Sequence, residues 1–469
     1  MSNRSNERIL FITGRLAEPA LRQVSDRLQE RWSLDCEITV LNVTVAALMH
    51  TKLIANRLHL NEQFDRVILP GWCQGDIREL TEKFGVPFER GPKDLYDLPT
   101  YLTEAEREPP DLSRYSIDII AEINHAPQMS WPEIEALAIR YRDSGADVID
   151  VGCIPGESWN EVGETVRRLK DLGLRISIDS FDRAEVEQAV RAGAELVLSA
   201  NSENREWLSQ LDVEAVVIPD TPDDWESLEQ SVEFYRSQQR PFRIDPIVEP
   251  IGCGFANSLQ RYWQARQQWP DLSIMMGIGN LTELSEVDSA GVNFLLAGYC
   301  EELGIGSVLT TEVINWCRSA VAEFDLARRT IHHAVTRNVP PKHLDSSLVM
   351  LRDPKLHNLS DKEIQQLAAA IKDRNFRILA EGEQLHLMNA GGHWNGTDPF
   401  EMFDQMLAEQ GSDIEASHAF YLGYEMCKAM TALTLGKQYR QDQALDWGFL
   451  TIPEVSAHER RRSEESQDE

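Results

Sequence analysis

Short apolar runs recur along the centre of the chain, and each of them ends at or near a polar residue. These runs cover residues 117–124, 148–152, 176–179 and 241–245. Each of the first three is followed by a stretch with helical periodicity. Strand–helix alternation of this kind is typical of a parallel (β/α)8 barrel, in which polar residues at the strand ends meet at one mouth. We therefore expect an α/β protein with a central TIM barrel.

The stretches between these runs contain residues that commonly start and stop helices. Ser130 and Glu133 have the spacing of a capping box, in which two side chains satisfy backbone N–H groups at the helix start. Gly145, Gly173 and Gly193 follow the three helical stretches, at the position where helices often end. Three consecutive units of helix, glycine and strand strengthen the prediction of a barrel.

Two breaks divide the chain into regions. A polar stretch at residues 103–112 is a predicted linker, and a pair of prolines at residues 340–341 marks a second break. We expect an N-terminal α/β domain, the barrel, a C-terminal α+β domain and a disordered polar tail, at residues 1–113, 114–340, 341–457 and 458–469.

The flanking domains are predicted from fewer elements. Strand-like runs at residues 9–13 and 66–70 indicate a small α/β domain before the barrel. After the barrel, strand-like runs at 376–380 and 384–388 precede a long helical pattern at 418–435. One face of this last helix carries His418, Tyr421, Glu425 and Lys428. We expect a solvated face with salt bridges, and a second substrate site or a docking surface is the alternative.

Composition narrows the class of protein. The chain has 469 residues, of which 42% are hydrophobic and 26% charged, as in soluble globular proteins. Acidic residues outnumber basic ones by 77 to 46, which gives a formal net charge of −31. This balance argues against nucleic acid and anionic membranes as partners. A phosphorylated ligand stays compatible if a local cation or metal is present, because distant surface charge is screened beyond about 8 Å.

The seven cysteines are scattered along the sequence and form no CxxC motif. The N-terminal residues are polar, and no run is long enough to cross a bilayer. We therefore expect reduced thiols and a cytoplasmic location. A homodimer is compatible with the sequence.

Polar residues at the ends of the expected barrel strands predict one shared site. Asn124, Asp150, Asp179 and Asp245 occupy these positions, and the carboxyl ends of parallel strands converge. An aspartate at a strand end also commonly caps a helix or forms a turn. For Asp150, which is followed closely by Gly152, both interpretations stay open.

The same segments resemble successive motifs of dihydropteroate synthases. Their sequences are AEINHAP, GADVIDVG, ISIDS and RIDP, at residues 121–127, 145–152, 176–180 and 243–246. The chain as a whole resembles the dihydropteroate synthase-related proteins of archaea and of some bacteria that make tetrahydromethanopterin. Those proteins combine a leading domain, a pterin-binding barrel and a trailing domain with segments similar to HAFYLG at residues 418–423.

The resemblance implies a transferase that condenses a dihydropterin diphosphate with an arylamine. Asp179 and Asp245, with an amide from Asn201, would hold the pterin edge, since a carboxylate can accept two N–H donors at once. Asn124 would lie near the diphosphate and help to place Mg²⁺, and Asp150 would lie at the same mouth. The arylamine is p-aminobenzoate or a ribosylated aniline, and the sequence does not distinguish them.

Two details of this site are less well determined by the resemblance. Asn201 is offset from the position of the family's asparagine, so Ser199 and Asn204 are alternatives for its role. Gly252 and Gly254 resemble the family's glycine-rich loop, where the backbone approaches a flat ligand closely.

Two segments depart from the family pattern. Residues 277–283, GIGNLTE, replace a Ser-Arg-Lys motif, and residues 308–313, VLTTEV, replace an Arg-x-His motif. Asn280 instead resembles an asparagine of methyltetrahydrofolate-dependent methyltransferases, although it could also cap a helix. Two alternative functions therefore stay open. One is methyl transfer with a separate corrinoid protein, and the other is a non-catalytic pterin-binding subunit.

A glycine-bearing turn, PGWCQG at residues 70–75, follows the second expected strand of the N-terminal domain. A phosphate-binding turn and an ordinary turn are both compatible with this segment. The sequence gives it no further role.

Overall fold

The computed structural model describes residues 7–32, 34–103, 110–411 and 414–454. It separates into two compact units, of which the first ends at Leu344 and the second begins at Asp345. None of the described helices combines the length and the apolar character that a bilayer crossing requires.

Two predictions concern segments that the structure does not fully describe. The expected linker at residues 103–112 falls largely on residues 104–109, which lie outside the described residues. The expected tail at residues 458–469 lies entirely outside them.

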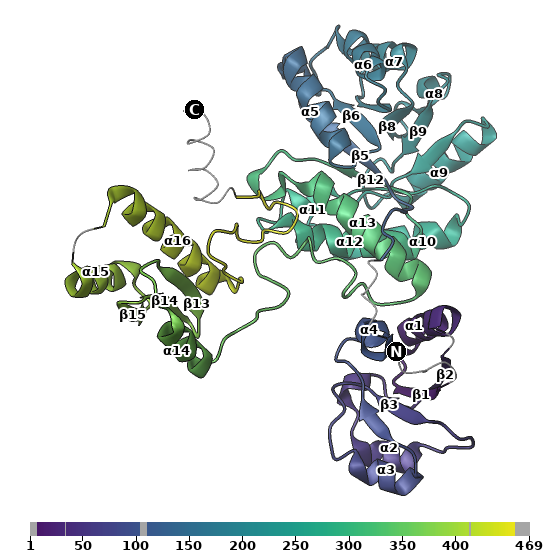
Figure 1. Cartoon of the computed structure of the whole chain (residues 1–469). Helices are drawn as coiled ribbons and strands as arrows, with labels where there is room; N and C mark the ends of the chain where they lie inside the picture. Colours follow the sequence, from purple (N-terminus) through teal and green to yellow (C-terminus); the bar gives the residue numbers. More distant parts are fainter. Residues whose placement is uncertain (1–6, 33, 104–109, 412–413, 455–469) are drawn as a thin grey trace. The chain divides into compact units, whose positions relative to one another are not determined.

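The first unit opens with a four-stranded parallel sheet in the order β2-β1-β3-β4 (Figure 1). Helices α1 and α4 pack on one face over Leu28 and Leu98, and α2 and α3 pack on the other over Ile54 and Leu80. The runs predicted at the two central strands are confirmed, whereas the short edge strands were not predicted. The elements are β1 (Arg8–Thr13), α1 (Glu18–Trp32), β2 (Asp35–Val40), α2 (Thr51–Arg57), β3 (Arg66–Leu69), α3 (Arg78–Phe84), β4 (Phe88–Arg90) and α4 (Leu98–Thr103).

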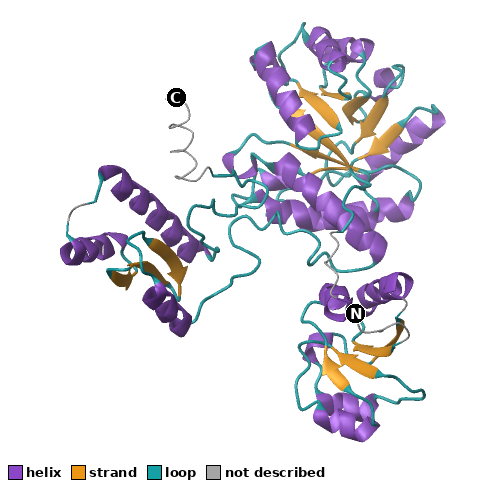
Figure 2. Cartoon of the chain, in the orientation of Figure 1, coloured by secondary structure: helices purple, strands orange, loops and turns teal. Residues whose placement is uncertain are grey.

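The barrel follows in the same unit and confirms the predicted fold class. Its eight parallel strands have the order β10-β9-β8-β7-β6-β5-β12-β11. A bridge between Ile244 and Ile274 closes the ring, and the helices lie around the strands (Figure 2). The strands are β5 (Asp118–Ile123), β6 (Val148–Gly152), β7 (Ile176–Asp179), β8 (Leu196–Ala200), β9 (Glu214–Val217), β10 (Phe242–Ile244), β11 (Met275–Gly277) and β12 (Ser307–Thr310).

The helices of the barrel begin and end where the sequence indicates. Ser130 and Glu133 form the expected capping box, and Gly193 ends α7 with a left-handed backbone. Inside the ring, Ile120, Leu198 and Met275 pack into an apolar core. The helices are α5 (Trp131–Asp143), α6 (Val162–Asp171), α7 (Arg183–Ala192), α8 (Arg205–Leu208), α9 (Trp225–Ser237), α10 (Phe255–Gln268), α11 (Gly279–Thr282), α12 (Ser289–Leu303) and α13 (Ala320–Arg337).

The second unit is an α+β fold with a three-stranded antiparallel sheet in the order β13-β14-β15. The first two strands and the long helix were predicted, but the third strand was not, because it begins and ends in glycine. The elements are α14 (Asp361–Ala370), β13 (Arg377–Glu381), β14 (Gln384–Asn389), β15 (Gly392–Gly396), α15 (Pro399–Gln410) and α16 (Ala416–Leu435).

The prediction of a solvated face on α16 is wrong. Glu425 is only 2% exposed and accepts a hydrogen bond of 2.6 Å from Tyr439. Lys428 pairs with Glu425 at 2.8 Å, and Tyr421 donates to Asp442 at 3.0 Å. These polar side chains pack against the segment that follows the helix, so they hold the unit together.

Arg328, on α13, fixes the end of the barrel opposite its mouth. Its side chain is 1% exposed. The guanidinium donates to the carbonyl oxygens of Ile117 and Gly145, the latter at 2.8 Å. It also pairs with Asp147 and Asp325, the latter at 2.6 Å. One buried cation therefore links three parts of the barrel: the residue before β5, the turn before β6, and the last barrel helix, α13.

Replacement of Arg328 by methionine should destabilise the protein strongly. The variant leaves Asp147 and Asp325 without their buried cation, and breaking a buried ion pair from one side costs about 3–5 kcal/mol. Urea unfolding measures the loss. Arg329→Met is the matched control, because Arg329 binds the same Asp325 but its side chain is 26% exposed, and it should cost about 1 kcal/mol or less. Equal losses in the two variants would contradict the role given to Arg328.

Candidate functional site

A cavity of about 350 Å³ opens where the carboxyl ends of the barrel strands meet. Leu198, Val216 and Met275 contribute its apolar floor. Four of its polar side chains are carboxylic acids, and no lysine, arginine or histidine of the described residues lines it. The polar lining consists of Glu122, Asn124, Asp179, Ser199, Asp245, Asn280, Glu283 and Thr311.

Three polar residues lie side by side on neighbouring strands beneath one edge of this cavity. Glu122, Asp150 and Ser177 are register partners on β5, β6 and β7. The Ser177 hydroxyl donates to Asp150 Oδ1 at 2.5 Å, whereas Asp150 Oδ2 makes no hydrogen bond with any described residue. A Cβ atom on Gly152 would lie 2.6 Å from Glu122 Oε1. The absence of a side chain at Gly152 therefore makes room for the Glu122 carboxyl group.

Burial and mutual repulsion raise the pKa values of these carboxyl groups. The pKa of Glu122 is raised to about 7 by burial and by the charges of Asp179 and Glu283. Burial raises the pKa of Asp179 to about 6. Burial, with the charges of Asp179 and Glu122, holds the pKa of Asp150 well above its usual range. Because like charges so close together cannot all ionise, the group retains protons near neutral pH.

Asp245 follows β10, three strands away from β7 in the sheet order, and so faces Asp179 across the mouth. The Tyr262 hydroxyl donates to Asp245 Oδ1, and the backbone N–H of Ile247 donates to the same oxygen at 2.8 Å. Burial raises the pKa of Asp245 to about 6, although both hydrogen bonds act in the opposite direction. These bonds orient the carboxyl group before any ligand enters.

The residues after β11 and β12 complete the lining. Asn280 donates through Nδ2 to the carbonyl oxygen of Val248 at 3.1 Å. Thr311 donates to Glu283 Oε1 at 2.9 Å. Asn280 is therefore positioned by the loop after β10, and Glu283 by the end of β12.

Two lining residues have an unusual backbone conformation. Ser199 and Ile247 have φ angles of 71° and 64°, in the left-handed region that non-glycine residues seldom adopt. For the β-branched Ile247 such a conformation costs on the order of 1–3 kcal/mol. The turn that places Asp245 is therefore held against a local energetic preference, as is common at binding and catalytic sites.

The structure brings four of the eight predicted site residues together. Asn124, Asp179, Asp245 and Asn280 all line the cavity, from four different strand ends. Their predicted contacts with a ligand stay predictions. Asp150 does not line the cavity, although it is the register partner of the lining residue Glu122, and its side chain is fully buried.

Asn201 and the two glycines lie outside the cavity lining. The side-chain oxygen of Asn201 accepts the backbone N–H of Glu203 at 3.0 Å, within its own turn. Of the alternatives, Ser199 lines the cavity. Gly254 has a φ of 129°, and a Cβ there would lie 2.4 Å from a carboxylate oxygen of Glu249. Backbone packing therefore explains Gly254, and for Gly252 only a φ of 90° is observed.

Glu122 and Glu283 were not predicted from the sequence. Glu122 interrupts an otherwise apolar strand and stands two residues before Asn124, hence on the same face of the strand. That alternation would have identified it. Glu283 follows a single helical turn, and no pattern in the sequence marks it. Glu312 is the carboxylate of the segment at residues 308–313 that replaces the family's Arg-x-His motif. It accepts a hydrogen bond from the backbone N–H of Val321 at 3.1 Å and does not line the cavity.

The side chains of the cavity do not match the ligand set of a resident metal ion. Among the described residues, no three His, Cys, Asp or Glu side chains are arranged to hold a metal ion. Asn124 donates through Nδ2 to Glu122 at 3.3 Å, and this bond does not involve its side-chain oxygen, which is the atom that could ligate a metal. These residues do not form a Mg²⁺ site by themselves, and a metal would have to arrive with the substrate.

Comparison with known proteins gives one family and one curated relative. The model of a family of unknown function (DUF6513) matches residues 7–93, within the N-terminal sheet region. The uncharacterized protein MJ0107 of Methanocaldococcus jannaschii is 25% identical over 526 aligned residues, which cover 93% of this chain and 98% of that protein.

The barrel is similar to solved dihydropteroate synthases. The enzyme of Yersinia pestis, solved with a pterin–sulfa conjugate, is 16% identical, with a TM-score of 0.39, and covers 48% of this chain and 95% of its own. The enzyme of Xanthomonas albilineans, solved with 7,8-dihydropteroate, is 18% identical, with a TM-score of 0.38, and covers 49% and 96%. The assignment of the fold rests on the strand order of the barrel itself.

Asp179→Asn should lower the pKa of Glu122, because it removes one of the charges that raise it. Infrared absorption of the protonated carboxyl group, followed against pH, measures this change, and Glu122→Gln identifies the band. Asp182→Asn is the control, since Asp182 caps α7 nearby and asparagine caps equally well. An unchanged titration in Asp179→Asn would contradict the coupling.

The same substitution should change how stability depends on pH. Native Asp179 keeps its proton up to about pH 6, whereas its ordinary pKa is 3.8. The raised pKa therefore stabilises the folded wild-type protein below about pH 4, and this stabilisation is lost as the pH rises to 6. The comparison uses the free energy of unfolding of Asp179→Asn minus that of wild type. This difference should be about 2–3 kcal/mol more favourable to the variant above pH 6 than at pH 4. Urea unfolding at both pH values tests the sign.

Proposed function

We propose that the barrel binds a reduced pterin and acts on it as a transferase of the dihydropteroate synthase type. The observation that carries this proposal is the convergence of Asn124, Asp179, Asp245 and Asn280 on one cavity. Asn124, Asp179 and Asp245 belong to separate motifs of the dihydropteroate synthase resemblance, and Asn280 resembles a pterin-contacting asparagine of the methyltransferases.

The chemistry of the lining suits a pterin. A pterin edge presents an amino group and ring N–H groups, and carboxyl oxygens accept such donors. Asp179 and Asp245 face each other across the mouth, so they can bind opposite sides of one flat ring. Leu198 and Met275 supply apolar surface for the ring faces. A lining rich in acceptors and free of cationic side chains among the described residues favours a ligand rich in donors.

Glu122 is suited to proton transfer in this cavity. Its pKa of about 7 is close to the pH at which an acid–base catalyst works best. In the condensation, the amine nitrogen attacks the exocyclic methylene carbon, the carbon–oxygen bond breaks, and diphosphate leaves with the electron pair. The amine must then lose a proton, and ionised Glu122 can accept it.

A diphosphate group has few partners in the lining itself. Because the described lining contains no lysine or arginine, charge on a departing diphosphate would have to be offset by Mg²⁺ that arrives with the substrate. The condensation is therefore proposed as a metal-dependent reaction of the substrate complex, in the cytoplasm.

Methyl transfer from a reduced pterin is the second candidate. The observation that favours it is the same acidic, cation-free lining of the described cavity, combined with Asn280. A methyl group leaves from a ring nitrogen that must gain a proton, and Glu122 can supply one near neutral pH. This reaction requires a corrinoid acceptor on a separate protein.

Asp179→Asn and Asp245→Asn should each weaken the binding of hydroxymethyl-dihydropterin. Each loses a charge-assisted bond worth about 1.5–3 kcal/mol, which corresponds to about tenfold or more in affinity. Titration calorimetry measures the affinity, and Asp182→Asn should bind like wild type. Wild-type affinity in both cavity variants would remove the site assignment.

Condensation and methyl transfer predict different results for Asn280→Ala. In the condensation Asn280 chiefly holds the ring, so binding and rate should fall together, by about 1–3 kcal/mol. In methyl transfer the rate should fall much more than the affinity, because the protonated nitrogen appears only in the transition state.

Released diphosphate, measured with the pterin diphosphate, Mg²⁺ and a panel of arylamines, distinguishes the reactions directly. We expect diphosphate release that stops when Mg²⁺ is chelated. Methyl transfer to a corrinoid protein, with no diphosphate release from any arylamine, would contradict the condensation. Pterin binding without either reaction would identify a non-catalytic subunit.

A further inference from the structure

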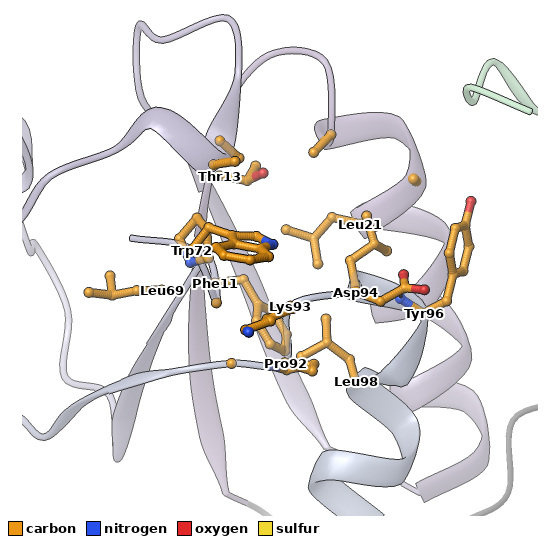
Figure 3. Close-up of a pocket in the computed structure, with 18 of the residues that line it drawn as sticks. Phe11, Thr13, Leu21, Leu69, Trp72, Pro92, Lys93, Asp94, Tyr96 and Leu98 are labelled. Carbon is orange, nitrogen blue, oxygen red and sulfur yellow. Dashed lines mark hydrogen bonds between the residues drawn. The ribbon is translucent and has the colours of Figure 1, made fainter. Parts of the chain in front are cut away.

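A second cavity, of about 360 Å³, lies in the N-terminal sheet region, far along the chain from the barrel motifs. Its walls come from the segments that follow three parallel strands, from the start of α1, and from Pro340, Lys342 and His343, which follow the last barrel helix in the same unit. Thr13 ends β1, Trp72 follows β3, and Lys93 follows β4 (Figure 3). The turn at residues 70–75, for which a phosphate-binding turn and an ordinary turn were both compatible with the sequence, contributes Pro70, Gly71 and Trp72 to these walls.

The order of the strands places this cavity where open α/β sheets bind ligands. Helix α1 leaves β1 toward one face of the sheet, and α3 leaves β3 toward the other. Strands β1 and β3 are neighbours in the order β2-β1-β3-β4. The chain therefore diverges at their carboxyl ends and leaves a crevice between them, and ligands of such sheets bind at this switch point.

Close backbone packing builds the crevice. A Cβ atom on Gly71 would lie 2.4 Å from the carbonyl oxygen of Pro92, and one on Gly91 would lie 2.9 Å from a side-chain carbon of Ile68. The turns after β3 and β4 can approach each other this closely only because both positions are glycine. The approach brings the next side chains, Trp72 and Lys93, onto the same wall.

Trp72 and Lys93 supply the chemistry of this wall. Trp72 is 55% exposed, although the residues below it are buried apolar side chains such as Phe11 and Leu98. The Lys93 ammonium lies over the Trp72 ring, 4.4 Å from its centre. The indole face that does not carry Lys93 can stack on a ligand ring, and the ammonium offers a partner for an anion.

We propose that this crevice binds a small planar aromatic molecule that carries one anionic group. The aromatic ring stacks on Trp72 above the apolar floor formed by Phe11, Leu21 and Leu98, and the anionic group, a carboxylate or a phosphate, pairs with Lys93. The ring contributes most of the contact, because most of the lining side chains are apolar. The ammonium contributes the selectivity for charge.

The full-length protein can be tested by titration calorimetry with three probes of the same ring. They are 2-naphthoate, 2-naphthyl phosphate and the neutral 2-naphthamide. We expect the two anions to bind and the amide to bind about tenfold more weakly or not at all. The anion that binds more tightly identifies the carboxylate or the phosphate as the natural group.

Variants locate the binding. Trp72→Ala should weaken both anions about tenfold or more, while Trp72→Phe should retain part of the affinity. Trp263→Ala is the matched control, because Trp263 lies on α10 with a similar exposure of 57%. Lys93→Gln should weaken the anions, and Lys93→Gln combined with Lys342→Gln, which removes both lysines that line the cavity, should weaken them to the level of the amide. Lys83→Gln is the control for Lys93→Gln, since Lys83 also lies over an aromatic ring, that of Phe84, but outside the crevice.

The outcomes separate this crevice from the barrel cavity. Affinity for the anions should be unchanged in Asp179→Asn. The proposal is overturned if neither anion binds at millimolar concentration, or if the amide binds as tightly as the anions. It is also overturned if Trp263→Ala weakens binding as much as Trp72→Ala does.

Discussion

The burial of several carboxyl groups in one barrel mouth is the constraint on which the site depends. The charge of Asp179 raises the pKa values of Glu122 and Asp150, the charge of Glu122 also raises that of Asp150, and burial raises the pKa values of Asp179 and Asp245. Without a cation in the described lining, the repulsion is relieved only by protons or by a ligand that donates hydrogen bonds. A donor-rich ring that enters this cavity can replace protons that the carboxyl groups would otherwise hold.

The fold separates this unstable arrangement from the part of the barrel that holds it together. At the amino ends of the strands, Arg328 is paired with Asp147 and Asp325 and bound to backbone carbonyls. At the carboxyl ends, like charges gather, and Ile247 adopts a strained conformation. Paired charges therefore lie at the amino ends of the strands and unpaired carboxyl groups at the carboxyl ends. TIM barrels in general have a stabilising end and a functional end in the same arrangement.

The sequence predicts regular elements well where periodicity is strong, and side-chain roles less well. The strands that lead to Asp179 and Asp245 are mostly apolar, with one polar residue in each, Ser177 and Arg243, so both carboxyl groups could be placed at the mouth. Glu122 was missed because one acidic residue inside such a run looks like part of it. Asn201 was misplaced because a bulge-like shift in pairing between β8 and β9 precedes it. Neither the single helical turn before Glu283 nor the shift in pairing before Asn201 has a pattern that the sequence alone reveals.

The two cavities use the same geometric rule with opposite electrostatics. Both lie at the carboxyl ends of parallel strands, but one is lined by four acids and the other carries Lys93 beside Trp72. A lysine placed among the barrel acids would lower their pKa values and fix them in the ionised state, because an opposite charge within a few ångströms favours ionisation. The raised pKa of Glu122 would then be lost. A chain that needs both protonated acids and an anion-binding cation must therefore keep them in separate cavities.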